Sequence, residues 1–272
     1  LGSFANAVAL RYDPERFLFA PSNGRSHCPQ CDRKLTFWEL IPVISWFALR
    51  GKCHGCKAKI SPRYVIVEIV MGAVLATIPL GIEAAGLWAL PQWSLYGVIA
   101  SWVGILLFLM IITLVDLKHY IIPDEATIVI AVLGIVIAYL SSPIWGIGVG
   151  SYLGPYALLA GFRDSVLINH LLGALAPGIV LLGLYLITKG RGIGFGDVKL
   201  APALGLAFGW PAGLVLVGLA FVIGTIVMLP QVFSKKASMK TAIPFGPFLA
   251  IAAVVLLAFG DNLAKAYLGI IG

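Results

Sequence analysis

The chain has 272 residues, of which 60% are hydrophobic and only 11% are charged, and its mean hydropathy is +0.98. A soluble domain of this length needs a polar surface, which 19 basic and 12 acidic residues cannot cover. This composition excludes an ordinary soluble globular protein. We expect an all-α polytopic membrane protein whose apolar surface faces lipid.

The basic residues give a pI of about 9.3, which by itself would also suit a nucleic-acid-binding protein. However, ten of the 19 Lys and Arg lie between Arg11 and Arg63, and most of the others form later clusters. The positive-inside rule produces such clusters in the cytoplasmic loops of membrane proteins. We therefore attribute the basic excess to topology and expect no nucleic-acid partner.

The opening run LGSFANAVAL is apolar but too short to span a bilayer, and no signal-peptide cleavage pattern follows it. We expect residues 1–10 to be the remnant of a first membrane helix. Residues 11–63 then form a basic cytoplasmic loop, and residues 64–272 form a transmembrane domain. Seven apolar stretches recur in that domain: 64–88, 94–115, 125–140, 165–188, 198–208, 212–230 and 243–259.

The apolar run from Val198 to Pro230 spans 33 residues, more than the ~20 that one membrane helix needs. Gly209, Pro211 and Gly213 interrupt it, which favours a hairpin of two helices. Two crossings also leave 17 of the 19 basic residues on the side of the basic loop. With the first-helix remnant, we expect about eight membrane helices.

Two features predict details of packing. Gly173 and Ala174 are small enough to let two helices approach closely. In the outer loop 141–164, aromatic side chains are expected to anchor the chain at the membrane interface, namely Tyr152, Tyr156 and Phe162.

The basic loop contains two Cys-x-x-Cys pairs, Cys28 with Cys31 and Cys53 with Cys56, with 21 residues between them. Each pair can turn two thiolates toward one ion, and two pairs complete a tetrahedron, as in zinc ribbons and knuckles. Disulfides and unligated thiols are the alternatives. Because cytoplasmic thiols stay reduced, we expect a metal.

Two histidines flank these cysteines and could compete as ligands, His27 and His54. A complete set of four thiolates leaves them outside the first coordination sphere. Such a closed set has no open position for a substrate, so the predicted zinc is structural and folds the loop.

Two aspartates are expected at the ends of membrane helices, where acidic residues are scarce. Asp116 ends the second full helix in VDLKHYIIPD, and Asp197 begins the fifth in GFGDVKL. The expected topology places both at the cytoplasmic face. Two carboxylates at one site can share a proton, so that one acts as base and the other as acid on a water molecule. This is aspartyl protease chemistry.

The helix dipole suggests a division of labour between the two aspartates. Negative charge is favoured at a helix N-terminus, as for Asp197, and disfavoured near a C-terminus, as for Asp116. Asp116 would then hold the shared proton. The alternative is that both are interfacial caps or solvated loop residues, and Asp124, after Pro123, is expected to cap the next helix in that way.

Neighbouring residues allow more than one interpretation. Gly194 and Gly196 could form a turn, or they could let the backbone beside Asp197 flex or approach a substrate closely. Lys199 is expected to be an interfacial anchor, and Glu68 a helix-dipole partner or the partner of a loop lysine.

These motifs resemble a known family. GFGDVKL resembles the Gly-x-Gly-Asp signature of intramembrane aspartyl proteases, and DLKHYIIPD resembles the first-aspartate motif of type IV prepilin peptidases. The four-cysteine loop is similar to the cytoplasmic domain of the bacterial enzymes. GSFANAVALR resembles the end of their first helix, and IPFGPFLA resembles their late helix. The resemblance covers nearly the whole chain in the expected order.

The resemblance implies a multi-pass enzyme of the bacterial inner membrane. Such enzymes cleave the basic leader of type IV prepilins and type II secretion pseudopilins at the cytoplasmic face, and many then methylate the new N-terminus with S-adenosylmethionine. It assigns catalysis to Asp116 and Asp197 and metal binding to the cysteine loop, which is associated with methyl transfer. The supporting residues of the aspartate motifs are Pro123, Asp124, Gly194, Gly196 and Lys199.

Two other functions fit parts of the pattern. A transporter could use membrane aspartates as ion sites, but it would place them near the midplane and contain an inverted repeat, and no repeat stands out. A non-catalytic scaffold for secretion assembly would need neither aspartate. No Gly-rich loop on a soluble α/β pattern marks a methyl-donor site, and the sequence assigns no oligomeric state.

Overall fold

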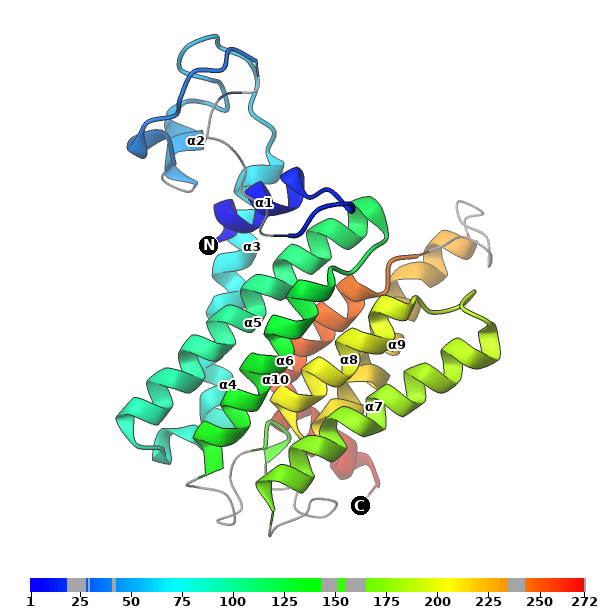
Figure 1. Cartoon of the computed structure of the whole chain (residues 1–272). Coiled ribbons are helices and arrows are strands. Elements are labelled where there is room, and N and C mark those ends of the chain that lie inside the picture. Colours follow the sequence, from blue (N-terminus) through cyan, green and yellow to red (C-terminus); the bar gives the residue numbers. More distant parts are fainter. Residues whose placement is uncertain are drawn as a thin grey trace.

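The computed structural model describes residues 1–18, 28, 30–40, 43–142, 151–154, 165–233 and 243–271 (Figure 1). Within these ranges the regular elements are all helices, and β-type pairing is limited to isolated bridge residues, such as Lys52 with Lys59. The predicted all-α class is confirmed.

The helices follow in this order. Before the first long membrane helix come α1 (Gly2–Arg11), the 3₁₀ turn η1 (Phe37–Leu40) and α2 (Ile44–Ala48). The membrane domain then contains α3 (Arg63–Leu75), α4 (Ile78–Ala84), η2 (Leu87–Ala89), α5 (Gln92–His119), α6 (Asp124–Ser141), α7 (Val166–Thr188), α8 (Phe195–Phe208), α9 (Ala212–Phe233) and α10 (Gly246–Ile271).

Six stretches of the described chain are long and apolar enough to cross a membrane: Arg63–Ala84, Gln92–His119, Asp124–Ser141, Ile168–Thr188, Ala212–Pro230 and Gly246–Tyr267. The first stretch is interrupted at Ala76 and Thr77, between α3 and α4. The helices α8 and α1 have 14 and ten residues, fewer than the ~20 that a membrane-spanning helix needs, so neither is among these six stretches. The multi-pass architecture is confirmed, whereas the count of eight is not.

The helix α5 forms much of the bundle core. It contacts α1, α6 and α10, and its side chains from Val98 to Val115 include many that are almost fully buried. Trp102 is fully buried and donates its indole N–H to the hydroxyl of Tyr152 at 2.8 Å. Both rings pack edge-on against Phe208 of α8.

This aromatic cluster corrects one expectation. Tyr152 is only 2% exposed and belongs to the core, so it is not an interfacial anchor. The sequence could not reveal this, because the partner that buries the ring, Trp102, is 50 residues away. Tyr156 and Phe162 lie outside the described residues.

The predicted division of the apolar run Val198–Pro230 into two helices is confirmed, because α8 ends at Phe208 and α9 begins at Ala212. The close packing predicted at Gly173 is also confirmed. A Cβ at this position would lie 2.5–2.7 Å from backbone atoms of Gly205 and Gly209. The helices α7 and α8 therefore approach at backbone contact distance, which holds the short α8 rigidly within the bundle.

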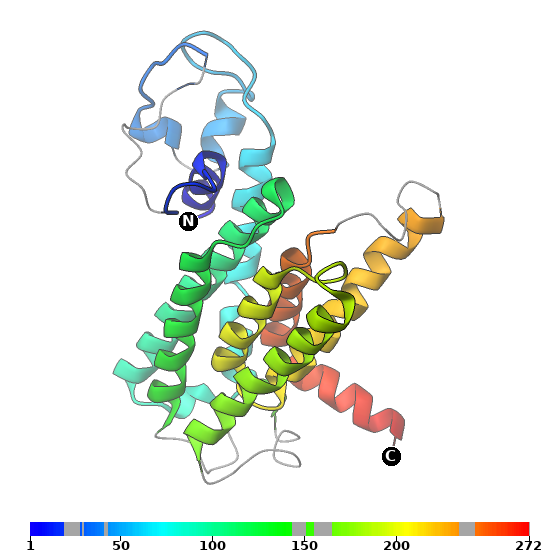
Figure 2. The same cartoon turned by 45° about the vertical axis from the view of Figure 1, so that its right-hand side comes forward.

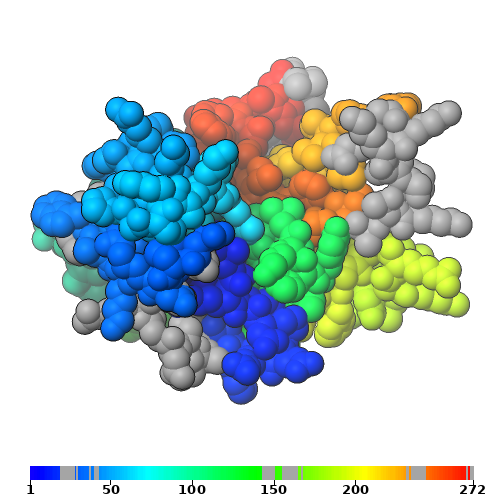
Figure 3. All heavy atoms as spheres, turned by 90° about the horizontal axis from the view of Figure 1, so that it is seen from above, coloured from blue at the N-terminus to red at the C-terminus, as the bar shows by residue number. Residues whose placement is uncertain are grey.

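The functional residues gather at one end of the bundle. The C-terminus of α5 and the N-termini of α8 and α10 lie at the same end, and the segment with α2 extends beyond it (Figures 1 and 2). Viewed from that end, the cysteine-containing segment lies on the left, the green helix end lies in the centre, and the orange and yellow-green helix ends lie farther to the right (Figure 3). The aspartates and the cysteines are thus presented on the same side of the membrane domain.

Candidate active site and metal centre

Asp116 lies in the last turn of α5 and is 3% exposed. Its Oδ2 accepts a hydrogen bond from the backbone N–H of Gly246 at 3.1 Å. Gly246 is the first residue of α10, and a Cβ at this position would lie 2.7 Å from that same oxygen. Close approach of the α10 backbone therefore fixes one oxygen of Asp116.

Asp197 is the third residue of α8 and is 5% exposed. Its Oδ2 accepts the backbone N–H of Gly194 at 3.1 Å, an arrangement that satisfies a free N–H at the helix start. Its Oδ1 is buried without a hydrogen-bond partner in the described part of the chain. A buried carboxylate oxygen without a partner is costly, so this atom is poised to bind a proton, a water molecule or a substrate group.

The two aspartates line one cavity of about 800 Å³, and their carboxyl groups are close enough to interact electrostatically. The walls come from the segment after α1, the turn between α5 and α6, the turn before α8 and the segment just before α10. The prediction that residues 81 positions apart meet at one end of the bundle is therefore confirmed. Two buried carboxyls beside an open cavity can divide the roles of acid and base.

The structure weakens the predicted division of labour. Asp197 does lie at a helix N-terminus and Asp116 near the C-terminus of its own helix, as expected. However, Asp116 also faces the N-terminus of α10 through the N–H of Gly246. Each aspartate therefore receives one backbone N–H from the start of a helix, and the dipole argument no longer singles out Asp116 as the proton carrier.

The glycines beside Asp197 have different roles. Gly194 precedes α8 with an ordinary φ of −73° and supplies the N–H to Asp197. Gly196 faces the side chain of Ile122, and a Cβ there would lie 2.9 Å from that residue's Cβ. The second glycine of GFGD therefore lets α8 pack against the segment that follows Asp116.

The expectation that Asp124 caps a helix is wrong. The N-cap position of α6 is Pro123, and no side chain caps this helix. Asp124 is instead the first helical residue, and its carboxylate pairs with the ammonium group of Lys199 from α8. Lys199 also lies 5.3 Å from the centre of the Phe195 ring. The pair links the starts of α6 and α8 at the rim of the aspartate cavity.

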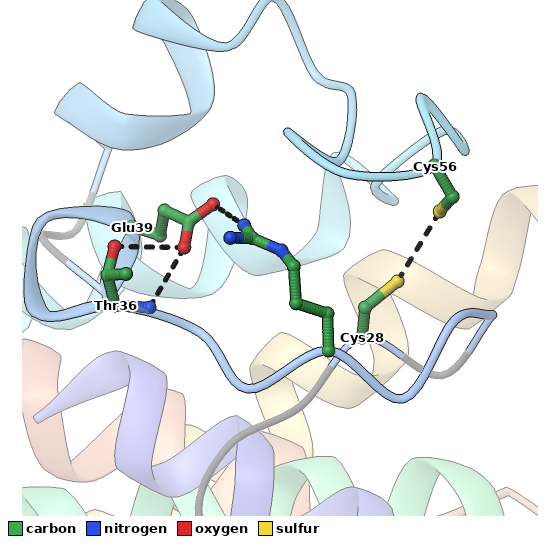
Figure 4. Close-up of polar contacts among 5 residues, drawn as sticks. Cys28, Thr36, Glu39 and Cys56 are labelled. Carbon is green, nitrogen blue, oxygen red and sulfur yellow. Dashed lines mark hydrogen bonds and ion pairs between the residues drawn. The ribbon is translucent and has the colours of Figure 1, made fainter.

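The four cysteines form one cluster whose sulfur atoms all lie within 4.8 Å of one another. None of them forms a disulfide. The Sγ atoms of Cys28 and Cys56 are 3.8 Å apart (Figure 4). A tetrahedral ion with metal–sulfur bonds of ~2.3 Å separates its ligands by about 3.8 Å, so this cluster could hold a metal ion. The exposed His54 has no place in the cluster, and His27 lies outside the described residues.

Each cysteine pair lies in the same type of turn. The N–H of Cys28 donates to the carbonyl of Arg33 at 3.0 Å, and the N–H of Asp32 donates to the carbonyl of Cys28 at 2.9 Å. At the second pair, Cys53, Ala58 and Lys57 repeat the pattern at the same spacing. Without an ion the thiols influence one another: backbone N–H groups of Cys56 and Gly55 lower the pKa of Cys53, whereas burial and the neighbouring thiols raise the pKa of Cys56.

Polar contacts hold the rest of the loop in place (Figure 4). Glu39 accepts hydrogen bonds from the backbone N–H of Thr36 at 2.8 Å and from its hydroxyl at 2.9 Å, and it pairs with Arg33. These contacts, the backbone N–H of Thr36 above all, lower the pKa of the Glu39 carboxyl. Glu39 therefore joins the first cysteine turn to the following 3₁₀ turn as a carboxylate.

Glu68 connects the loop to the membrane domain. Its Oε2 accepts the backbone N–H of Val43 at 2.7 Å. Neither sequence-based interpretation of Glu68 anticipated this contact, since it was expected to serve the helix dipole or a lysine. Gly246 was likewise missed as the partner of Asp116. The motif IPFGPFLA was the only signal for it, and it indicated a helix without indicating its partner.

Two family models match the chain in succession. The model of the bacterial peptidase A24 N-terminal domain matches residues 1–81, and that of the type IV leader peptidase family matches residues 103–229. The second match contains both aspartates, and the first contains all four cysteines. No solved structure matches the chain significantly.

Curated relatives match over most of their length. A prepilin leader peptidase/N-methyltransferase from Aeromonas salmonicida is 33% identical over 98% of this chain and 82% of its own length. Proteins of the same name from Stutzerimonas stutzeri and Pseudomonas aeruginosa are 33% and 30% identical, over 92% and 98% of this chain and 76% and 82% of their own lengths.

Proposed function

Because the chain belongs to the type IV leader peptidase family, we propose that it cleaves the leaders of type IV prepilins and pseudopilins. Asp116 and Asp197 are the catalytic residues of this proposal. The observation that carries it is the shared cavity: two nearly buried carboxyls, each fixed by one backbone N–H, line the same space.

The two carboxyls supply all the groups that peptide hydrolysis needs. One carboxylate takes a proton from a water molecule, which then attacks the scissile carbonyl. The protonated partner gives its proton to the carbonyl oxygen, and the roles reverse when the amine leaves. Burial strengthens the sharing of one proton, because two charges this close together cannot both be stabilised.

The location of the cavity suits a substrate that lies partly in the membrane. A prepilin has a short basic leader followed by an apolar helix, so scission has to occur at the membrane edge. We place that edge at the cytoplasmic face of the inner membrane, with the cysteine loop on the same side, since this loop carries the largest basic cluster. Residues 11–63 then form the metal-binding loop, and residues 64–272 form the protease domain.

We further propose that the cysteines bind one structural zinc ion. The 3.8 Å sulfur separation and the two equivalent turns fit a closed tetrahedron of Cys28, Cys31, Cys53 and Cys56. Zinc in such a set folds the loop and has no position left for a substrate. We also include methylation of the new N-terminus with S-adenosylmethionine, because the similar proteins are named N-methyltransferases as well as leader peptidases.

The proposal is tested by product analysis. The purified chain in lipid nanodiscs is incubated with a prepilin, with and without S-adenosylmethionine, and the mass of the product is measured. We expect one cut after the leader, and a product heavier by one methyl group when the donor is present. A prepilin left intact, under conditions in which the Pseudomonas aeruginosa relative cleaves it, would overturn the proposal.

A further inference from the structure

The cysteine loop exposes large apolar side chains. In α2, which has no charged residue, Ile44 and Phe47 are 68% and 62% exposed. They are three residues apart and therefore share one face of the helix. Trp38, in the 3₁₀ turn η1 that packs against α2, is 75% exposed. We call these three side chains the apolar patch. None of them lines the aspartate cavity.

Trp46 determines which way the apolar patch faces. Its indole N–H donates to the carbonyl of Ile60 at 3.2 Å, and a Cβ at Gly51 would lie 2.9 Å from its ring. These contacts hold one side of α2 against the rest of the loop. The ring of Phe47 packs edge-on against that of Trp46, with 5.3 Å between the ring centroids. Trp46 thus fastens α2 to the loop, and Ile44 and Phe47 remain on its outer face.

Glu68 places the start of α2 at the membrane edge. It is the sixth residue of α3, whose first residue, Arg63, begins a stretch long and apolar enough to cross a membrane. At 1.5 Å per residue, Glu68 lies roughly 7 Å along the helix from Arg63. Its carboxylate accepts the N–H of Val43, directly before α2, at 2.7 Å. A glutamate side chain at this position cannot reach far beyond the start of its helix, so α2 begins level with that start.

Lipid surrounds the part of α3 that lies next to α2. On its first two turns, Ile66 and Ile69 are more than half exposed, as expected of a helix face in contact with lipid. Seen from the end of the bundle, the cysteine-containing segment lies to one side of the green end of α5 and is not stacked on it (Figure 3). The segment is therefore beside the helices, where lipid headgroups can meet it.

The charge of the loop matches that of an anionic lipid surface. Residues 28–62 include six basic and two acidic side chains, and one of the acidic ones, Glu39, pairs with Arg33. The other five basic side chains are exposed, namely Lys34, Arg50, Lys52, Lys57 and Lys59. Exposed aromatic rings among exposed cations are typical of segments that lie in the interface of anionic membranes.

We propose that the apolar patch rests in the headgroup layer of the membrane that holds the bundle, with the surrounding cations on the phosphates of anionic phospholipids. This inference is independent of the proposed cleavage activity. Membrane contact would hold the cysteine loop beside α3, and would leave the aspartate cavity open to a substrate. The loop would then be a peripheral membrane domain, not a domain surrounded by water on all sides.

Two other occupants of the patch fit the structure less well. A second copy of the chain, docked patch to patch, would bring the exposed cations of both loops together, and like charges repel. A soluble acidic protein would match the charge. However, it would have to reach the level at which Val43 meets Glu68, where headgroups already surround α3.

Photolabelling from lipid tests the proposal on the full chain with its metal. The protein is placed in nanodiscs of phosphatidylcholine, with or without phosphatidylglycerol, and with a trace of phospholipid that carries a diazirine beside the glycerol group. Illumination and peptide mapping then locate the label. We expect label on residues 38–47 as well as on Ile66 and Ile69, and roughly fivefold more on 38–47 when phosphatidylglycerol is present. High salt should reduce this difference.

A double variant removes the apolar contribution. Ile44→Ser with Phe47→Ser should lower the label on residues 38–47 roughly tenfold, without changing the label on α3. Phe233→Ser is the matched control, because Phe233 is 78% exposed at the end of α9 and belongs to another part of the molecule. Metal content and prepilin cleavage report whether each variant is folded.

Each outcome bears on the proposal. Label on α3 without label on residues 38–47 overturns it and needs no variant, and so does equal labelling of the folded double variant and the wild type. Equal labelling in the two lipid mixtures overturns the assignment to anionic lipid. Crosslinks from residues 38–47 to a second chain, in place of lipid, would make the patch a contact between copies and also overturn the proposal.

Discussion

The aspartate cavity and the cysteine loop lie at the same end of the molecule but are held together by different forces. Asp116 and Asp197 belong to long or tightly packed helices whose buried side chains form one continuous core. Between residues 28 and 62, by contrast, the only buried apolar side chains of the described chain are Cys28 and Cys53, whereas Trp38 and Phe47 are largely exposed.

This contrast shows two ways of positioning reactive groups. Close packing of backbone against backbone fixes the aspartates, and it requires no ligand. The loop has little buried apolar surface, so we expect the proposed metal site to supply most of its stability. Changes at the two sites should therefore have separable effects.

The largest expected effect is on catalysis alone. Asp116→Asn and Asp197→Asn keep the shape of each side chain but remove its ability to exchange a proton. Each should lower prepilin cleavage by roughly 10²–10⁴-fold while leaving the metal content of the loop unchanged. Timed cleavage assays and metal analysis measure the two effects. A variant that cleaves at the wild-type rate would remove that aspartate from the mechanism.

The next effect should be confined to the loop. Removing the metal with a chelator, or replacing both Cys53 and Cys56 by Ser, should open residues 28–62 to trypsin because the loop lacks an apolar core. Cleavage of prepilin should fall less than about tenfold, or ~1.4 kcal/mol in the activation free energy.

Two measurements check this prediction on the same samples, peptide mapping of trypsin cuts and the thermal unfolding of the membrane domain. Cys56→His is the matched control, since an imidazole can replace a thiolate in a zinc site. A loop equally resistant with and without chelator would contradict the contrast between the two regions.

Local patterns made both regions predictable in part. The cysteine quartet follows from spacing alone, because each pair forms its turn within six residues, as at Cys28 to Arg33. The aspartates could be placed at helix ends because hydropathy marks where helices leave the membrane. The prediction that Asp197 begins a helix is confirmed to within two residues, since α8 begins at Phe195, and the carboxylate of Asp197 accepts the N–H of Gly194 there.

Contacts between distant segments could not be predicted in the same way. Gly246 reaches Asp116 across 130 residues of sequence, and Val43 reaches Glu68 across 25. Asp124 had a plausible local role as a cap, but the approach of Lys199 from α8 provides a partner for its carboxylate. The residues around each of these carboxylates are compatible with a local role and with a distant partner. Only the packing of the segments in three dimensions shows which of the two occurs.

A smaller effect is expected where the backbone of α10 positions the carboxyl group of Asp116. Gly246→Ala would place a Cβ 2.7 Å from Oδ2 of Asp116 and displace the carboxyl group. We expect cleavage to fall by roughly 10–100-fold, mostly in kcat, because small displacements of reacting groups are costly. Gly218→Ala is the control, since a Cβ at Gly218 meets no atom within 4 Å.

Thermal unfolding in nanodiscs distinguishes displacement from general damage in this experiment. Similar unfolding temperatures for the two alanine variants, with a rate defect only at Gly246, would support the positioning role. Equal cleavage rates would show that Asp116 does not depend on the start of α10.

The smallest effect is expected at the rim of the aspartate cavity. The side chains of Lys199 and Asp124 are 36% and 63% exposed, so water screens their ion pair. Asp124→Asn and Lys199→Met should each lower the free energy of unfolding by less than about 1 kcal/mol and change cleavage only a few-fold. A double-mutant cycle at low and high salt measures the coupling, which should shrink as salt rises. A loss of cleavage activity as large as that of Asp116→Asn would instead place Lys199 or Asp124 among the reacting groups. The catalytic site would then include the exposed rim of the cavity as well as its buried aspartates.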